Sequence, residues 1–286
     1  MALSGSLQGV VELFRGPSQP AVDGGRMALG DHFRELRARL LRSVLAMVVA
    51  VIVAFFFYNQ LLDLITRPYD EATTMLNPGT QTKIYVSGVG GGLMLQLKLC
   101  SVAGLVASSP VWLYQLWAFI VPGLHRHERR WTLLFVAAAG PLFAAGVGVG
   151  YYVLPKALSV LISFTPHGVE NLNDFDHFFS FTARMLLVFG IAFEIPLFVV
   201  MLNLAGVVTG KALGRHRPWI IVGTFVFAAV ATPSTDPFSM LFLAIPMTLL
   251  FFLSEVIARL VDRRRDHVAA KQEAWSDDHA SPLDGD

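Results

Sequence analysis

Hydrophobic positions along the chain gather into six long runs that are separated by short polar segments. A helix needs about 20 apolar residues to cross the hydrocarbon core of a bilayer. The runs lie at residues 40–62, 86–109, 131–154, 178–206, 218–232 and 236–253. We therefore expect an all-α fold, a polytopic membrane protein with six transmembrane helices.

The last two runs are shorter than the others. The stretch ATPSTDPFS lies between them, and its prolines and turn-forming residues favour a tight reversal of the chain. The fifth and sixth helices are thus predicted to form a short hairpin that either thins the bilayer or leaves the fold shallow at that place.

Composition supports a membrane protein. Hydrophobic residues make up 54% of the 286 positions and charged residues 15%, whereas a soluble domain carries about 25% charged residues. One cysteine, Cys100, excludes both an intramolecular disulfide and a cysteine zinc cluster. We expect it to be a small buried apolar residue.

The positive charges indicate the topology. Lys and Arg number six up to and including Arg42 at the start of the first run, three between the second and third, three between the fourth and fifth, and five after the last, against three in all the opposite loops. Because cytoplasmic loops are enriched in Lys and Arg, both termini are predicted to be cytoplasmic. Residues 27–265 would form the membrane domain, with a disordered tail at 1–26 and an acidic disordered tail at 266–286.

The first candidate site is the segment DHFRELRARLLR, which immediately precedes the first run. Its leucines recur at helical spacing and its charges point elsewhere, a pattern typical of an amphipathic helix at the membrane surface. Glu35 either forms an ordinary surface pair with Arg39, four residues on, or contacts a cationic ligand.

The second candidate is the segment 108–130, SSPVWLYQLWAFIVPGLHRHERR, interpreted as an aromatic-rich cytoplasmic loop. An interfacial aromatic belt would also contain Trp and Tyr. It would not explain the carboxylate Glu128 among three arginines, which either balances their charge or binds a ligand.

The third candidate is Glu194, in the middle of the fourth run in VFGIAFEIPLFVV. A charged group in hydrocarbon is costly and usually functional, and Pro196 bends the helix beside it. Lys98, in the second run, is a possible partner; alternatively, Lys98 extends to the membrane surface and Glu194 serves packing.

No nucleophile elbow, paired intramembrane aspartates or phosphate loop is present, so we expect no enzyme, cofactor or metal site.

Four motifs, in order, resemble the TatC family, the polytopic receptor subunits of the twin-arginine protein translocase. HFRELRARL is similar to the family signature HLxELRxRL, and the 108–130 segment is similar to its first cytoplasmic loop. FGIAFEIP and TPSTDPFSMLFLAIPM match further motifs, and the resemblance covers about residues 27–262.

The resemblance implies six helices in a concave, glove-like wall and binding of twin-arginine signal peptides at the cytoplasmic face. It assigns signal contacts to Glu35, Arg37, Phe119 and Glu128, and outer-face motif positions to Pro68 and Asp236. It also implies TatA- and TatB-type single-span partners, self-association, contact with membrane lipid, and the proton motive force as energy source. The location would be the bacterial cytoplasmic membrane, and nucleic acid is not an expected partner.

We therefore expect a non-enzymatic subunit that exports folded proteins, with Glu194 receiving a partner helix. The alternative is a secondary transporter of small solutes or ions that uses Glu194 and Lys98 as a mid-membrane relay.

Overall fold

The computed structural model describes residues 29–76, 82–124, 129–166, 171–231 and 237–278. Within these ranges the chain is almost entirely helical, which confirms the all-α prediction. In chain order the elements are α2 (Leu29–Phe56), α3 (Tyr58–Thr74), β1 (Thr82–Tyr85), α4 (Gly91–Ala107), α5 (Ser109–Leu124), α6 (Arg129–Ser163), β2 (Asn171–Asp174), α7 (Phe175–Phe193), α8 (Ile195–Leu204), α9 (Gly210–Arg215), α10 (Arg217–Ala231) and α11 (Pro237–Asp278).

Six apolar helical segments in the described ranges correspond to the six predicted runs. Four are long and apolar enough to cross a membrane: Phe33–Phe56, Ala137–Ser163, Phe175–Leu204 and Met240–His267. Helices α4 and α5 are together long and apolar enough for a fifth span, but they are bent by 52° at a short break, a geometry shared by broken spans and re-entrant loops. The remaining segment, α10, has 15 residues and is therefore about 22 Å long, which agrees with the prediction of a short fifth helix.

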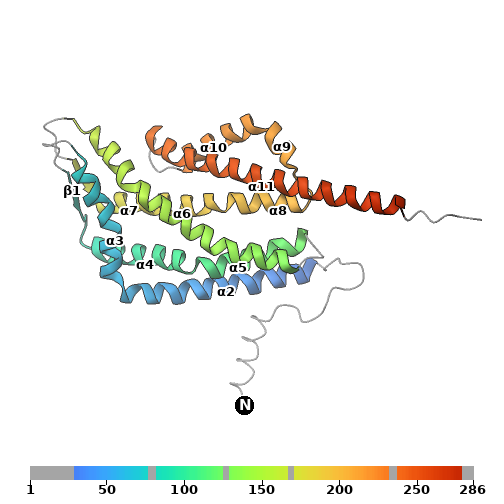
Figure 1. Ribbon diagram of the computed structural model, residues 1–286. Helices are drawn as coiled ribbons and strands as arrows, with labels where there is room; N and C mark the ends of the chain where they lie inside the picture. Colours follow the sequence, from blue (N-terminus) through green and yellow to red (C-terminus); the bar gives the residue numbers. More distant parts are fainter. Residues whose placement is uncertain (1–28, 77–81, 125–128, 167–170, 232–236, 279–286) are drawn as a thin grey trace, which may run out of the picture.

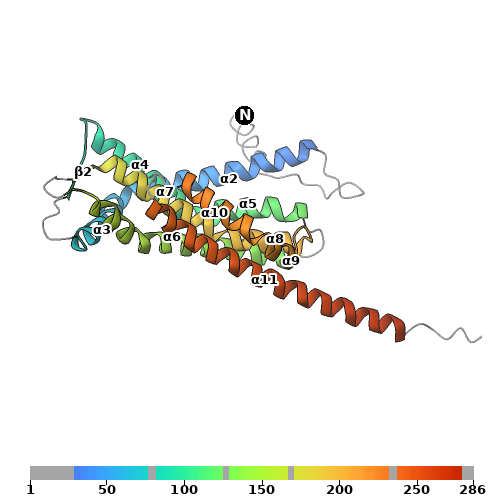
Figure 2. The ribbon, with the colours of Figure 1, turned by 90° about the horizontal axis from the view of Figure 1, so that it is seen from above.

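The helices run roughly side by side along the long axis of the molecule (Figure 1). α2 lies with α4 and α5, α6 crosses next to α7, and α10 and α11 lie on the far side, as the view from above also shows (Figure 2). The start of α2, the end of α5, the end of α8 and α9 share one end of the molecule, hereafter the α9 end. The strands and α3 mark the opposite end, the β1 end.

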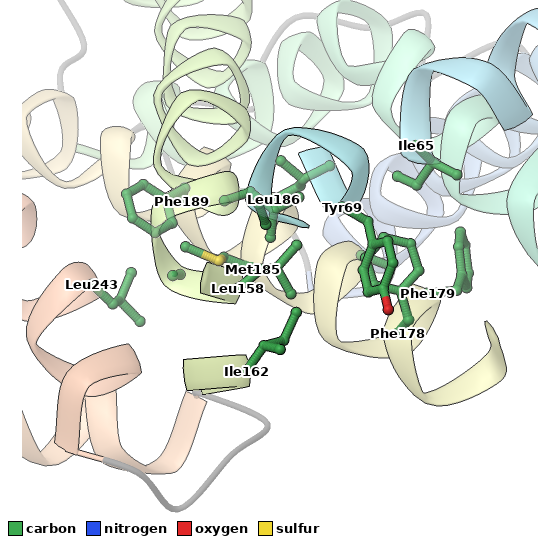
Figure 3. Packing of buried hydrophobic residues seen from close by; sticks show 14 of the residues in the cluster. Ile65, Tyr69, Leu158, Ile162, Phe178, Phe179, Met185, Leu186, Phe189 and Leu243 are labelled. Carbon is green, nitrogen blue, oxygen red and sulfur yellow. The ribbon is translucent and has the colours of Figure 1, made fainter. Parts of the chain in front are cut away.

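Apolar side chains from α3, α6, α7 and α11 form the main core (Figure 3). Phe189 is only 1% exposed and packs on α6 beside Gly146 and Gly150. Tyr69 meets Phe178 edge to face with ring centroids 5.5 Å apart. By contrast, many side chains of α2 are exposed, because lipid can solvate apolar side chains that a soluble protein would have to bury.

Close packing of α6 against α7 depends on Gly146. A Cβ at this position would lie 2.5 Å from the backbone oxygen of Phe189 and 2.9 Å from the Cα of Gly190, and backbone atoms cannot move aside.

We expect Gly146→Ala to destabilise the fold by about 1–3 kcal/mol through overpacking. Gly148→Ala, two residues further along α6 where a Cβ would meet nothing within 4 Å, should leave the thermal unfolding midpoint in detergent unchanged or slightly raised; equal losses in both variants would contradict this interpretation.

Two strands at the β1 end were not predicted. β1 and β2 pair in parallel, with Thr82 opposite Asn171. Asp174 then caps α7 by accepting a hydrogen bond from the backbone N–H of Asp176. The Ser87 hydroxyl also donates to this carboxylate, and these two hydrogen bonds hold the pKa of Asp174 below its ordinary value.

The predicted loop at 108–130 is instead largely helical, because α5 occupies Ser109–Leu124. Pro110 stands in the first turn, where its missing N–H has no helical partner to lose. Leu113 and Trp117, four residues apart, are buried on one face of the helix. The aromatic density therefore marks a packed helix.

The last helix is much longer than the short sixth helix predicted from the apolar run. α11 continues to Asp278, so a helix occupies residues 266–278, where a disordered tail was expected. The segment after Leu253 contains no Gly or Pro before Pro282 and is rich in Ala, Arg, Lys, Gln and Glu, which are strong helix formers.

Candidate functional site

Glu35 lies near the start of α2, at the α9 end of the molecule. Arg39 donates two hydrogen bonds to its Oε1, from Nε at 3.0 Å and from Nη2 at 2.6 Å. This confirms the predicted pair four residues apart, with both side chains about one-fifth exposed. Neither bond uses Oε2, so with respect to the described part of the chain this carboxylate holds one guanidinium and keeps a second acceptor. Arg37, on the same helix, is exposed.

Helix α5 carries the aromatic residues of the second candidate site. The Trp112 indole donates to the Leu105 carbonyl at 3.0 Å, which ties the start of α5 to α4 across their bend. Phe119 is half-buried further along the helix. Glu128 lies outside the described residues, between the end of α5 and the start of α6; both of these flanking helix ends are at the α9 end (Figure 1).

Glu194 stands at the break between α7 and α8. Pro196, which has no N–H to donate, follows in the first turn of α8, which explains why the helical hydrogen bonding is interrupted here. The Trp117 indole N–H, from α5, donates to Glu194 Oε2 at 3.1 Å. The other oxygen, Oε1, is buried and has no hydrogen-bond partner among the described residues.

A buried acceptor without a donor is unusual, because nearly all buried polar atoms in native structures are hydrogen-bonded. The break therefore presents a carboxylate that is oriented by a tryptophan and has an unused oxygen. This arrangement can receive a donor from a bound molecule or from a partner chain.

Lys98 does not partner Glu194. Its Nζ lies 2.5 Å from Asp176 Oδ1, and both side chains are about half exposed. Asp176 is in the first turn of α7 and Glu194 follows its last residue, so 18 residues of helix, about 27 Å, separate them. The predicted Glu–Lys pair was wrong because a nearer carboxylate at the β1 end was overlooked.

Pro68 is buried in the interior of α3, at the β1 end. A proline in a helix leaves the carbonyl four residues earlier without its N–H donor. Here that carbonyl belongs to Leu64, and the Tyr151 hydroxyl of α6 donates to it at 2.8 Å. Pro68 thus creates a specific link between α3 and α6. Asp236, the other predicted outer-face residue, lies outside the described residues.

A second buried carboxylate, Glu255 of α11, was missed by the sequence analysis. Its side chain is 2% exposed. Arg217, at the start of α10, donates to both of its oxygens at 2.6 Å, and Arg259 adds a third contact to Oε1 at 2.6 Å. The signal was available, because Glu255 interrupts the apolar stretch LLFFLSEVIARL just as Glu194 interrupts its own run.

Next to this cluster, Asp262 and Arg265 of α11 fix the connection from α8 to α9. Asp262 accepts hydrogen bonds from Asn203 Nδ2 at 2.7 Å and from the Gly210 backbone N–H at 2.7 Å. Arg265 donates to the carbonyls of Asn203 and Leu204 at the end of α8. These contacts join α11 to the end of α8 and to the start of α9.

Taken together, the fold and the site define a multi-pass membrane protein with buried or partly buried carboxylates that contact guanidinium or indole groups. Among the described residues, no group of three or more His, Cys, Asp or Glu could hold a metal ion. The contacts of Glu35, Glu194 and Glu255 with Arg39, Trp117, Arg217 and Arg259 all lie within the chain and join neighbouring turns or helices.

The chain belongs to the TatC family. The family model described as Sec-independent protein translocase protein (TatC) matches residues 31–246. TatC of Frankia casuarinae is 43% identical over 93% of this chain and 75% of its own length. TatC of Xylanimonas cellulosilytica is 39% identical over 86% of this chain and 88% of its own, and TatC of Haemophilus influenzae is 34% identical over 84% and 92%.

The fold agrees with this assignment. A crystal structure of a twin arginine translocase receptor, TatC, superposes with a TM-score of 0.68 at 32% identity, and the match covers 80% of this chain and 98% of the other. The family consists of membrane components of a protein translocase and not of enzymes, so this chain is a protein-transport component.

Proposed function

We propose that this chain binds twin-arginine signal peptides at the cytoplasmic face of a bacterial membrane. Together with TatA- and TatB-type single-span subunits, it exports folded proteins at the expense of the proton motive force. The resemblance to the family supplies the partners and the energy source, and the geometry at the α9 end supports the binding step.

The observation that carries the proposal is the guanidinium already bound to Glu35. Arginine presents a planar set of donors that suits a carboxylate, whereas lysine is a point charge. Arg39 occupies one oxygen of Glu35, and an arginine of the signal peptide would take Oε2 or displace Arg39. Glu128, in the segment between α5 and α6, is proposed to hold the second arginine, with Phe119 of α5 contributing an aromatic contact to the peptide and Arg37 limiting the approach of other cations.

The distribution of charge supports the orientation of the chain. The basic residues of α2, α9 and the last part of α11 lie at the α9 end, whereas Arg67, Lys83 and Lys156 belong to elements toward the β1 end. Under the positive-inside rule, the α9 end is therefore proposed to face the cytoplasm.

Glu194 is proposed to receive a polar group of a partner helix. We expect Glu194→Ala to reduce recovery of a TatB-type subunit in co-purification by roughly tenfold, because a hydrogen bond to a charged group contributes about 1.5–3 kcal/mol. Glu194→Gln should retain much of the binding, since an amide can still accept from Trp117 and also donate. Trp117→Phe, which removes only the indole donor, should have an intermediate effect, and unchanged recovery with Glu194→Ala would refute this role.

Export in cells tests the proposed function as a whole. In a bacterium that lacks its own TatC-family subunit, this chain and its cognate single-span subunits should restore export of a folded reporter with a twin-arginine signal, but not with a twin-lysine signal. The transporter alternative predicts instead that the purified chain alone takes up solutes or ions in liposomes. Its Glu194–Lys98 relay is not formed in the structure, because Lys98 binds Asp176.

A further inference from the structure

A basic cavity of about 530 Å³ lies between the connection to α9 and the last turns of the apolar part of α11. Four cations line it, namely Lys211, Arg259, Arg263 and Arg265, and two carboxylates, Asp262 and Asp266. The formal charge of the lining is thus positive. The cavity is at the α9 end, as Glu35 is, but none of the proposed signal-binding residues lines it.

Among the described residues, no carboxylate forms an ion pair with Lys211, Arg263 or Arg265, whereas Arg259 is already paired with the buried Glu255. Both oxygens of Asp262 are already used, by Asn203 and by the Gly210 N–H. Arg265 donates to two neutral carbonyls, so its charge is not cancelled by a carboxylate there. Asp262 and Arg265 are thus fixed before any ligand arrives, whereas the exposed side chains of Lys211 and Arg263 become ordered on binding.

An apolar stripe on α11 ends at Arg263, which also lines this cavity. Leu249, Leu253, Val256 and Leu260 are each between 51% and 62% exposed, and with Arg263 they recur at spacings of four and three residues on one face of the helix. Ten residues separate Leu253 from Arg263, which is about 15 Å and equals the thickness of one leaflet of the hydrocarbon core.

We propose that the cavity and the stripe together form a binding site for an anionic phospholipid. The phosphate contacts Lys211 and Arg263, and one acyl chain lies along Leu253, Val256 and Leu260. A free phosphate would use the cations but not the stripe. A zwitterionic lipid would use both, but its positive head group would be repelled by the basic lining. Basic pockets between membrane helices are known to select anionic head groups.

Lipid binding to the full purified chain in detergent, followed by native mass spectrometry, tests this site. The probes are phosphatidylglycerol and phosphatidylcholine with identical acyl chains. The wild type should retain phosphatidylglycerol more strongly than phosphatidylcholine. In the double variant K211Q/R263Q the affinity for phosphatidylglycerol should fall roughly tenfold or more, since each basic residue near an anionic head group adds to the binding free energy. The control R215Q/R264Q removes the same charge from α9 and α11 at exposed positions outside the cavity lining, and it should bind like the wild type.

Two further measurements separate a lipid from a free anion. The variant V256S/L260S should weaken phosphatidylglycerol binding, and an excess of inorganic phosphate should fail to displace the lipid. Equal retention of both lipids, an equal loss in the two charge variants, or displacement by inorganic phosphate with no effect of V256S/L260S would each overturn the proposal. Thermal unfolding of every variant verifies that the fold is retained, which is expected because the replaced residues are exposed.

Discussion

Replacing Glu255 with alanine is expected to lower the free energy of unfolding by about 3 kcal/mol, near the low end of what removing one partner of a buried ion pair costs. The carboxylate is 2% exposed and joins Arg217 of α10 to Arg259 of α11. Without it, two guanidinium groups face each other with no counter-charge. The loss is not larger because both arginine side chains are almost half exposed and can reach water or head groups.

The consequence should be local to the hairpin of α10 and α11. Arg217 and the apolar contacts of Ile220 attach the short helix α10 at the α9 end. In Glu255→Ala one of these two attachments is lost, so this helix should become more accessible to protease and to hydrogen exchange. Glu255→Gln, which keeps the shape and one acceptor, should lose less stability. Titration with a denaturing detergent measures the free energies, and an unchanged midpoint for Glu255→Ala would show that the cluster does not hold the hairpin.

Replacing Glu35 with alanine is expected to weaken binding of a twin-arginine signal peptide by roughly tenfold or more, since a charge-assisted hydrogen bond contributes about 1.5–3 kcal/mol. Arg39 provides the matched control, because it is the partner of Glu35 on the same helix. Arg39→Gln releases the carboxylate from its internal guanidinium, so binding should be retained or strengthened. If Arg39→Gln weakened binding as much as Glu35→Ala, the pair would serve the structure of α2 and not recognition.

The pattern of hydrophobic positions was sufficient to predict the helical class and the approximate place of each apolar segment, because a membrane span must be long, apolar and helical. The same pattern gave wrong helix limits where a segment is helical without being continuously apolar. α5 appeared to be a loop since its polar flanks and prolines interrupt the run, and α11 extends beyond its apolar part since its later residues are polar helix formers.

The site could be predicted only in part, because sequence distance says little about contacts between helices. Glu35 and Arg39 are four residues apart, so their pairing followed from helical geometry. Trp117 and Glu194 are 77 positions apart and Lys98 and Asp176 are 78. Local spacing in the sequence does not indicate that these two pairs form, nor that a Lys98–Glu194 pair does not.

We propose above all that this TatC-family chain recognises arginine in a signal peptide through a carboxylate at the α9 end. The most direct measurement is binding of a fluorescently labelled twin-arginine peptide, and of its twin-lysine counterpart, to the purified chain in nanodiscs, repeated with Glu35→Ala and Glu128→Ala. We predict that the wild type prefers the arginine peptide and that each substitution removes the preference. Equal binding of the two peptides by the wild type, or a preference that survives both substitutions, would contradict the claim.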